Sequence, residues 1–339
     1  MLKNCLLVSD LHLTVNPRDE YRWKIFEQMR NYVTKYKIGT VIIAGDLTDA
    51  KDNHSGILVN RLIHELAVLA QETKPYPRVV ILRGNHDGIN PDWPFFMFLN
   101  SLNGVEFIAF PKRDTIANAT VILLPHTKIP EQKWKYWLPK CELAEVCIAH
   151  MTVTGAHSEH NQVLKGIDKK WLHEIGIPIY SGDVHVPQVI KNLTYIGAPY
   201  PIKFGDSFTP GCIYFDRAGE EYRIDLKNIK RALITVRRKS DLAQLDDLKE
   251  EDQVKVRIKL PRSSLPEWSK LQASVKLRCK NAKIDLVSCD LRLEEDIEDE
   301  EEERIGPILD PFADYCQSKQ LRPRLVQVGK SCLEAAKGE

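Results

Sequence analysis

Residues 79–87 read Val79-Val80-Ile81-Leu82-Arg83-Gly84-Asn85-His86-Asp87. The four apolar residues, three of them β-branched, are typical of a strand that is buried on both faces. They lead into amide, imidazole and carboxylate side chains, which are all metal-binding groups. The stretch therefore predicts a buried strand whose carboxyl end carries a candidate metal site.

Four other places in the chain repeat this pattern of an apolar run followed by metal-binding side chains. The polar segments are Asp10-Leu11-His12, Gly45-Asp46-Leu47-Thr48-Asp49, His150 and Gly182-Asp183-Val184-His185. In layered α/β folds the functional crevice lies outside the carboxyl ends of the strands. We therefore expect side chains from all five segments to converge on one edge of the molecule.

The spacing of apolar residues predicts an α/β fold. Helical periodicity follows the first two strands, at residues 21–36 and 58–70. Strands separated by such helices predict βαβ units and a largely parallel sheet covered on both faces. Short strand-like runs over 194–224 predict a second, antiparallel sheet that closes a sandwich. Residues 91–99 are either a short helix packed on the core or an exposed apolar patch for self-association.

Beyond residue 226 the runs predict a small β-α-β-α-β module. We expect a core domain over 1–226, a capping and DNA-binding domain over 227–293, and an acidic linker with a terminal docking helix over 294–339. An ordinary helix lying on its own domain is the alternative for the last segment. Residues 227–283 hold 16 basic and 7 acidic side chains, which suggests a polyanionic substrate. A solvated lysine-rich surface is the alternative.

The composition is that of a folded protein, with 43% hydrophobic and 28% charged residues among 339. The first residues lack the pattern of a signal peptide, and no apolar run is long enough to span a membrane. The eight cysteines form no CxxC pair and are expected to be reduced, mostly buried thiols. A cytoplasmic protein with no membrane partner is expected.

The candidate metal ligands mix carboxylate, amide and imidazole donors, which favours Mn²⁺ over Mg²⁺. They are Asp10, His12, Asp46, Asn85, His150, Asp183 and His185. Asp46 is the natural bridge, because one carboxylate can bind two ions. Two ions so held lower the pKa of a bridging water and stabilise charge on phosphoryl oxygens. The set therefore indicates a two-metal hydrolase.

Hydrolysis also needs a proton donor for the leaving oxygen, and His86 suits that role near neutral pH. Asp87 is predicted to orient His86, so both are candidate catalytic residues. Asp49 is predicted to accept a hydrogen bond from a ligand histidine. His54 is a candidate to approach the scissile phosphate; the alternative is a solvent-exposed loop histidine.

Together these segments resemble the signature of the calcineurin-like metallophosphoesterase superfamily. The protein-phosphatase branch has an arginine after the position of Asp49 and a glutamate at that of Asp87, and this chain has neither. The closer resemblance is to SbcD-type nucleases, the DNA-cleaving subunits of a double-strand-break repair complex. Residues 182–188 and 195–201 look like the metal loop of that family and the strand leading out of it.

The resemblance implies a four-layer sandwich with a capping domain and a C-terminal helical tail. It assigns one Mn²⁺ to Asp10, His12, Asp46 and His185, the other to Asp46, Asn85, His150 and Asp183, and catalysis to His86. Most members have histidine where this chain has Asp183. Carboxylate is still a good ligand for Mn²⁺ or Mg²⁺, so two ions are expected. Its added negative charge is expected to weaken the attraction for phosphate.

The resemblance further implies a Mn²⁺-dependent exonuclease with single-strand endonuclease activity, acting in DNA repair, recombination and replication. It implies a homodimer that binds an SMC-like, SbcC-type ATPase through its C-terminal helix. The short chain and residues 152–156 resemble phage recombination nuclease subunits, which places the protein in a bacterial or phage-infected cytoplasm. Alternatives are a phosphodiesterase for cyclic nucleotides or nucleotide conjugates, and a non-catalytic scaffold for a partner ATPase.

Overall fold

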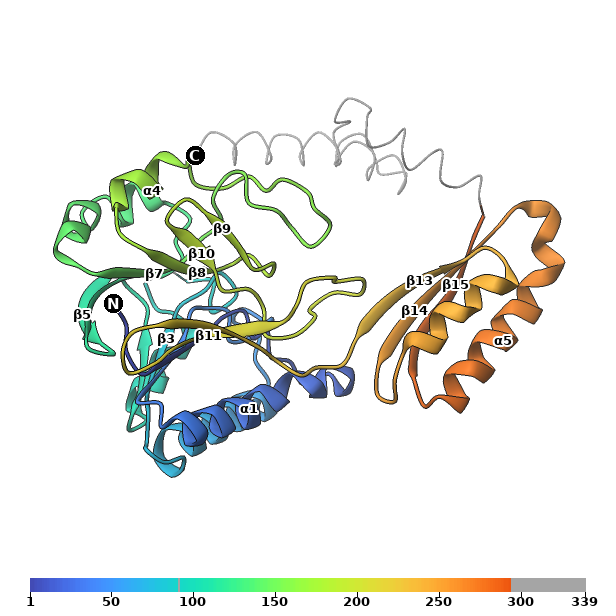
Figure 1. Ribbon diagram of the computed structural model, residues 1–339, viewed down its shortest axis with the longest axis horizontal. Helices are drawn as coiled ribbons and strands as arrows, with labels where there is room; N and C mark the ends of the chain where they lie inside the picture. Colours follow the sequence, from blue (N-terminus) through green and yellow to red (C-terminus); the bar gives the residue numbers. More distant parts are fainter. Residues whose placement is uncertain (91, 294–339) are drawn as a thin grey trace, which may run out of the picture. The chain divides into compact units, whose positions relative to one another are not determined.

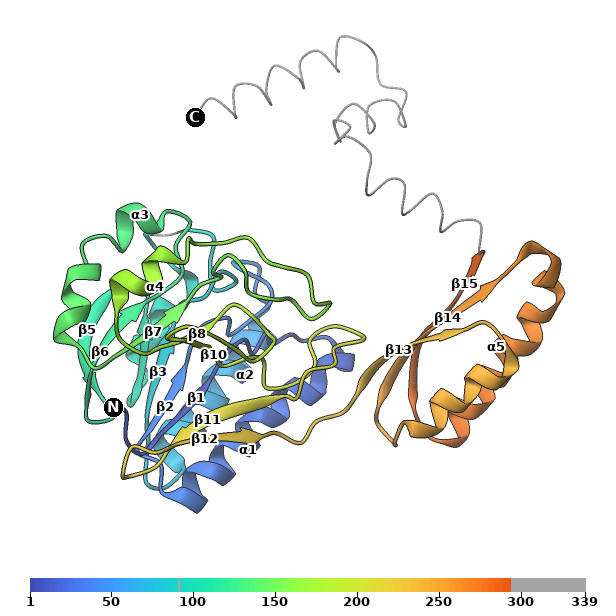
Figure 2. The same cartoon turned by 45° about the horizontal axis from the view of Figure 1, so that its top comes forward.

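Two six-stranded sheets face each other in the larger part of the structure, and helices cover the outer face of each (Figure 1). This computed structural model describes residues 1–90 and 92–293. Figure 2 shows the two sheets from a second direction. The predicted α/β sandwich is confirmed, with helices, sheet, sheet and helices as its four layers.

The first sheet has the strand order β12-β11-β1-β2-β3-β4. Neighbours among β1 to β4 are parallel, whereas β11 is antiparallel to both β1 and β12. The strands are β1 (Cys5–Val8), β2 (Thr40–Ile43), β3 (Arg78–Leu82), β4 (Val105–Ile108), β11 (Gly211–Phe215) and β12 (Glu221–Asp225). The parallel pairs need long crossovers, and these contain the helices predicted from the apolar spacing, α1 (Glu20–Tyr36) and α2 (Gly56–Ala67).

The second sheet has the order β5-β6-β7-β8-β10-β9, with parallel pairing from β6 to β10. Its strands are β5 (Lys112–Ile116), β6 (Ala119–Leu124), β7 (Val146–His150), β8 (Ile179–Gly182), β9 (Gln188–Ile190) and β10 (Leu193–Tyr195). The antiparallel second sheet predicted over 194–224 is therefore wrong. That segment switches sheets, since β10 lies beside β8 while β11 and β12 extend the first sheet.

Successive side chains of the central strands point to opposite faces of the sheet, so each strand contributes to two apolar layers. Leu6 and Val8 of β1 pack in the layer under α1 and α2, whereas Leu7 packs between the sheets with Ile148 of β7. A third layer lies on the outer face of the second sheet, with Trp134 and Trp171. Because both faces of these strands are buried, their carboxyl ends are held firmly, and these ends carry the candidate ligands.

Short helices complete the larger part of the structure. They are η1 (Pro17–Asp19), η2 (Val68–Glu72), η3 (Phe95–Ser101), α3 (Pro130–Lys133), η4 (Leu138–Leu143) and α4 (Lys170–Ile175). In η3 the side chains of Phe96 and Leu99 are fully buried, as expected for a short helix on the core. Trp93, just before it, is 80% exposed. The described residues 92–99 thus combine features of both interpretations.

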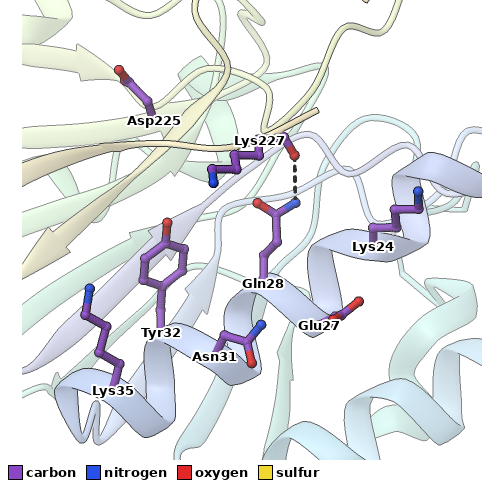
Figure 3. A pocket seen from close by; sticks show the side chains of 8 residues that line it. All are labelled: Lys24, Glu27, Gln28, Asn31, Tyr32, Lys35, Asp225 and Lys227. Atoms are coloured by element: carbon purple, nitrogen blue, oxygen red, sulfur yellow. Dashed lines mark hydrogen bonds between the residues drawn. The ribbon is translucent and has the colours of Figure 1, made fainter. Parts of the chain in front are cut away.

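A third, three-stranded sheet has the order β13-β14-β15. The elements from residue 231 onward are β13 (Arg231–Val236), η5 (Lys239–Asp247), β14 (Gln253–Leu260), η6 (Arg262–Glu267), α5 (Trp268–Asn281) and β15 (Asp285–Leu293). Just before this sheet the chain is attached to α1, because Gln28 donates a hydrogen bond to the carbonyl of Lys227 (Figure 3). An open cavity of about 440 Å³ lies beside this contact.

The chain divides into two compact units. The larger comprises Met1–Ile234, Leu248–Lys255 and Ala282–Val287, and the smaller comprises Thr235–Asp247, Val256–Asn281 and the described residues from Ser288 onward. The division passes through the strands of the third sheet. The predicted acidic linker and docking helix lie outside the described residues. Across residues 1–90 and 92–293, no helix combines the length and apolar character that crossing a bilayer requires.

Candidate metal centre

The predicted ligands lie together at the carboxyl ends of the central strands. Asp10, Asp46 and Asn85 follow β1, β2 and β3, while His150 ends β7 and Asp183 follows β8. Ligand atoms of five of the predicted ligands, with those of His86, form three groups whose members lie within 4.8 Å of one another: Asp10, His12 and His185; His12, Asp46 and His86; and Asp10, Asp46 and His150. The two sheets thus bring residues from all five polar segments to one site.

Asp46 lies at the middle of the cluster. Its Oδ2 is 3.4 Å from Nε2 of His12, and its Oδ1 is 3.4 Å from Nε2 of His150. Burial raises the pKa of Asp46, but the imidazoles of His150 and His12 outweigh this effect and hold the pKa below its usual range. Because each oxygen faces a different histidine, this carboxylate has the geometry of a bridge between two cations.

His150 is completely buried, and its ring orientation follows from its partners. The Nδ1 atom lies 2.8 Å from the carbonyl of Ala44, to which it donates. The Nε2 atom therefore faces the cluster, 3.1 Å from the side-chain amide of Asn85 and 3.7 Å from Oδ1 of Asp183, where it can bind a metal ion. A backbone carbonyl that fixes the ring of a ligand histidine in this way is a common feature of metal sites.

Two features of the oxygens show that the site fits divalent cations. The Oδ2 atom of Asp10 is buried and has no hydrogen-bond partner among the described residues. The side-chain amide of Asn85 lies 3.0 Å from Oδ1 and 2.9 Å from Oδ2 of Asp46, so its oxygen can join those carboxylate oxygens around an ion. A buried acceptor without a partner is costly, and a hard divalent ion satisfies several oxygens together. The donor set therefore fits Mn²⁺ or Mg²⁺.

The backbone under the ligands is in the left-handed region. The φ angles are +58° at Asp10, +41° at His12, +56° at Asp46 and +83° at Asp183. Such conformations are unfavourable for non-glycine residues and cluster at functional sites. At Gly45 a side chain is excluded outright, because an added Cβ would lie 2.1 Å from Nδ1 of His150. The strain and the close approach both indicate that these loops are built around the cluster.

His86 lies at the outer side of the cluster and contacts Asp49 rather than Asp87. Its Nδ1 is 3.5 Å from Oδ1 of Asp49, and the same oxygen is 3.2 Å from Nδ1 of His12, the contact expected for Asp49. Asp87 is fully buried, and its carboxylate accepts the backbone N–H groups of Gly84, Asp46 and Leu47. The prediction that Asp87 orients His86 is therefore wrong. Asp87 holds two ligand loops together.

His54 packs on neighbouring side chains and is only partly exposed. Its Nε2 is 2.8 Å from Oγ1 of Thr48, and its ring stacks on Phe95 with centroids 4.3 Å apart. The side chain is half-buried, so the expectation of a solvent-exposed histidine is wrong. These contacts give His54 a packing role between the loop after β2 and η3.

Two residues that support the ligands were not predicted. Glu159 accepts a hydrogen bond from Nδ1 of His185 at 2.5 Å, and this bond lowers the pKa of Glu159 to about 2. Thr152 donates from Oγ1 to Oδ2 of Asp183 at 2.6 Å. Both lie in the long segment between β7 and α4, which has no strand or helix pattern that would place them. The adjoining metal ligands are thereby fixed in orientation.

Replacing Glu159 with glutamine should weaken Mn²⁺ binding by about 10- to 100-fold, because carboxylate partners of ligand histidines contribute that much. Glutamine keeps the size but loses the charge that orients His185. Isothermal titration calorimetry with Mn²⁺ measures the effect, and Glu174→Gln on α4, an exposed site, is the matched control. Equal affinities of Glu159→Gln and wild type would show that the contact does not support the metal.

Similarity to known proteins agrees with this geometry. A family model described as calcineurin-like phosphoesterase matches residues 4–187, more than half of the chain. No curated protein matches the chain.

Similar solved structures include a novel archaeal phosphodiesterase, with 16% identity, 66% of this chain and 99% of that chain covered, and a TM-score of 0.36. GAP50, the anchor in the inner membrane complex of Plasmodium, has 11% identity, coverages of 67% and 90%, and a TM-score of 0.37. The Pseudomonas putida nuclease MPE has 13% identity, coverages of 66% and 88%, and a TM-score of 0.29. On the family match and the ligand cluster, the chain belongs to the calcineurin-like phosphoesterase family.

Proposed function

We propose that this phosphoesterase hydrolyses the phosphodiester bonds of DNA, as the nuclease subunit of an SbcCD-type repair and recombination complex. The observation that carries the chemistry is the cluster around Asp46, whose two oxygens face histidines of different sheets. When bound, two Mn²⁺ ions would supply a water of lowered pKa and positive charge beside the phosphoryl oxygens. Asp10, His12, Asp46 and His185 would hold one ion, and Asp46, Asn85, His150 and Asp183 the other.

A row of basic side chains on β14 supports a polymeric substrate. Val254, Val256, Ile258 and Leu260 are buried on one face of this strand. Lys255, Arg257 and Lys259 alternate with them, so they lie on the opposite face, about 6.6 Å apart at a rise of about 3.3 Å per residue. Evenly spaced cations of this kind suit the phosphate backbone of a nucleic acid, where replaced counterions supply much of the affinity.

The remaining parts of the proposal concern the type of DNA cleavage and the subunits with which the chain assembles. We infer Mn²⁺-dependent exonuclease activity with single-strand endonuclease activity, a homodimer, and attachment to an SMC-like ATPase through the segment beyond residue 293. The core of residues 1–226 would then carry the chemistry and residues 227–293 would contact DNA. These inferences rest on the resemblance of the ligand segments to SbcD-type nucleases and on the basic composition of 227–283.

The purified chain is expected to degrade labelled linear DNA in Mn²⁺, more slowly in Mg²⁺, and not in EDTA. The reason is the mixture of imidazole and carboxylate donors, which favours Mn²⁺. Cleavage should also fall steeply with added salt, because the basic row must compete with counterions. An Asp46→Asn preparation made in the same way should be inactive, which excludes a contaminating nuclease.

Hydrolysis of bis(4-nitrophenyl) phosphate without any cleavage of DNA would contradict the proposal that this chain cleaves DNA without the ATPase subunit. The assay would then be repeated with the ATPase subunit present. Continued failure to cut DNA would favour the alternative, a phosphodiesterase for cyclic nucleotides or nucleotide conjugates.

A further inference from the structure

An open cavity of about 570 Å³ adjoins the metal centre on the side of Asp183. Thr152 and Asp183 both line it and are joined by a hydrogen bond of 2.6 Å. The other oxygen of Asp183 faces the cluster, 3.7 Å from Nε2 of His150. One carboxylate therefore belongs to the candidate metal site and to the wall of the cavity, so a molecule bound at the metals would continue into this space.

The lining combines apolar and polar side chains, including two exposed ammonium groups. Pro130 and Ile167, both half-buried, contribute apolar surface, and His126 and Thr127 contribute polar surface. Lys128, in the segment before α3, and Lys170, at the start of α4, border the cavity from separate elements and are both exposed. Sugar and base surfaces pack on apolar side chains, whereas lysine binds phosphate as a point charge. The lining thus has the chemistry of a nucleotide site.

We propose that this cavity, the Lys128 groove, binds the nucleoside and phosphate that follow the scissile phosphate of a single nucleic-acid strand. The inference rests on the proposed function and adds its substrate class. A strand has a phosphate at every nucleotide, so a strand cut at the metals must place a neighbouring phosphate close by. The two lysines offset the negative charge that Asp183 brings to this side. A small phosphodiester without a second phosphate gains nothing from them.

Substitutions at Asp168 and at the lysines should change strand binding in opposite directions. It lines the same groove, and its Oδ2 lies 4.0 Å from Nζ of Lys170. Its carboxylate competes with a bound phosphate for that ammonium group. Its Oδ1 accepts the backbone N–H of Lys170 at 2.9 Å, a contact that asparagine retains. Removing a lysine should therefore weaken strand binding, and Asp168→Asn should strengthen it.

The experiment compares KM for a short single-stranded oligothymidylate and for bis(4-nitrophenyl) phosphate, in Mn²⁺ at low salt. We expect Lys128→Ala and Lys170→Ala each to raise KM for the oligonucleotide by roughly five-fold, the order expected for one lost phosphate contact. Asp168→Asn should lower that KM. None of the three should change KM for the small diester. Lys133→Ala, an exposed lysine of α3 outside the groove, is the matched control.

The outcomes distinguish a failure of the Lys128 groove proposal from a failure of the nuclease proposal. Wild type that cleaves both substrates, with lysine variants that leave both KM values unchanged or raise them equally, would overturn the groove and leave the nuclease proposal standing. Wild type that cleaves the small diester alone, both without and with the ATPase subunit, would overturn both. A rise in KM for Asp168→Asn would overturn the assignment of the second phosphate to Lys170.

Discussion

Replacing Asp46 with asparagine should lower kcat/KM for DNA by about a thousand-fold or more. One carboxylate oxygen faces His12 and the other faces His150, each at 3.4 Å, so the substitution weakens both candidate metal positions. A two-metal centre stabilises transition-state charge by several kcal/mol, and about 1.4 kcal/mol corresponds to a factor of ten. Calorimetric titration should show that Mn²⁺ binding is lost or greatly weakened at both positions.

Asparagine is chosen because it preserves the local structure. The backbone N–H of His86 donates to Oδ1 of Asp46 at 2.9 Å, and the amide oxygen of asparagine can still accept it. Asp49→Asn is the matched control, since Asp49 contacts the outer nitrogen of His12 and the ring of His86 without lying between the two metal positions, and it is 45% exposed. Its effect should be about 10- to 100-fold. Two tightly bound Mn²⁺ ions in Asp46→Asn would refute the bridging role.

The parts of the site that depend on local sequence were predictable. Asp10, Asp46, Asn85 and Asp183 lie within three residues after a buried strand and His150 ends one, and parallel strands bring their carboxyl ends together. The apolar runs before Asp10, Asp46 and Asn85 therefore predict both the strands of the sheet and the position of the ligands. The same argument gave α1 and α2, because their periodic apolar faces must cover that sheet.

The parts that depend on distant contacts were not predictable. Glu159 reaches His185 only because its segment is tied down elsewhere, through Gln188 at the backbone of His157 and Tyr195 at the N–H of Val153. No periodicity marks such a loop. Asp87 was misassigned for a related reason. Its neighbour in sequence is His86, but a buried carboxylate is held by the backbone N–H groups that surround it, and these come from two loops.

Replacing His86 with alanine should lower kcat for DNA by about 10²- to 10⁴-fold, the usual contribution of a general acid. The side chain is 29% exposed and contacts Asp49 at the edge of the cluster, which suits a group that protonates the leaving oxygen. Its backbone contact to Asp46 survives in alanine. Calorimetric titration should therefore still show two Mn²⁺ ions bound, and the melting temperature should change little.

The choice of substrate distinguishes proton donation from metal binding. A 4-nitrophenolate group leaves without being protonated, so His86→Ala should cost much less on bis(4-nitrophenyl) phosphate than on DNA. Ligand atoms of His86, His12 and Asp46 also lie within 4.8 Å of one another, so a role as metal ligand must be tested directly. A variant that binds one Mn²⁺ fewer and loses activity equally on both substrates would make His86 a ligand. Full Mn²⁺ binding with a loss that grows with the basicity of the leaving group would make it the proton donor.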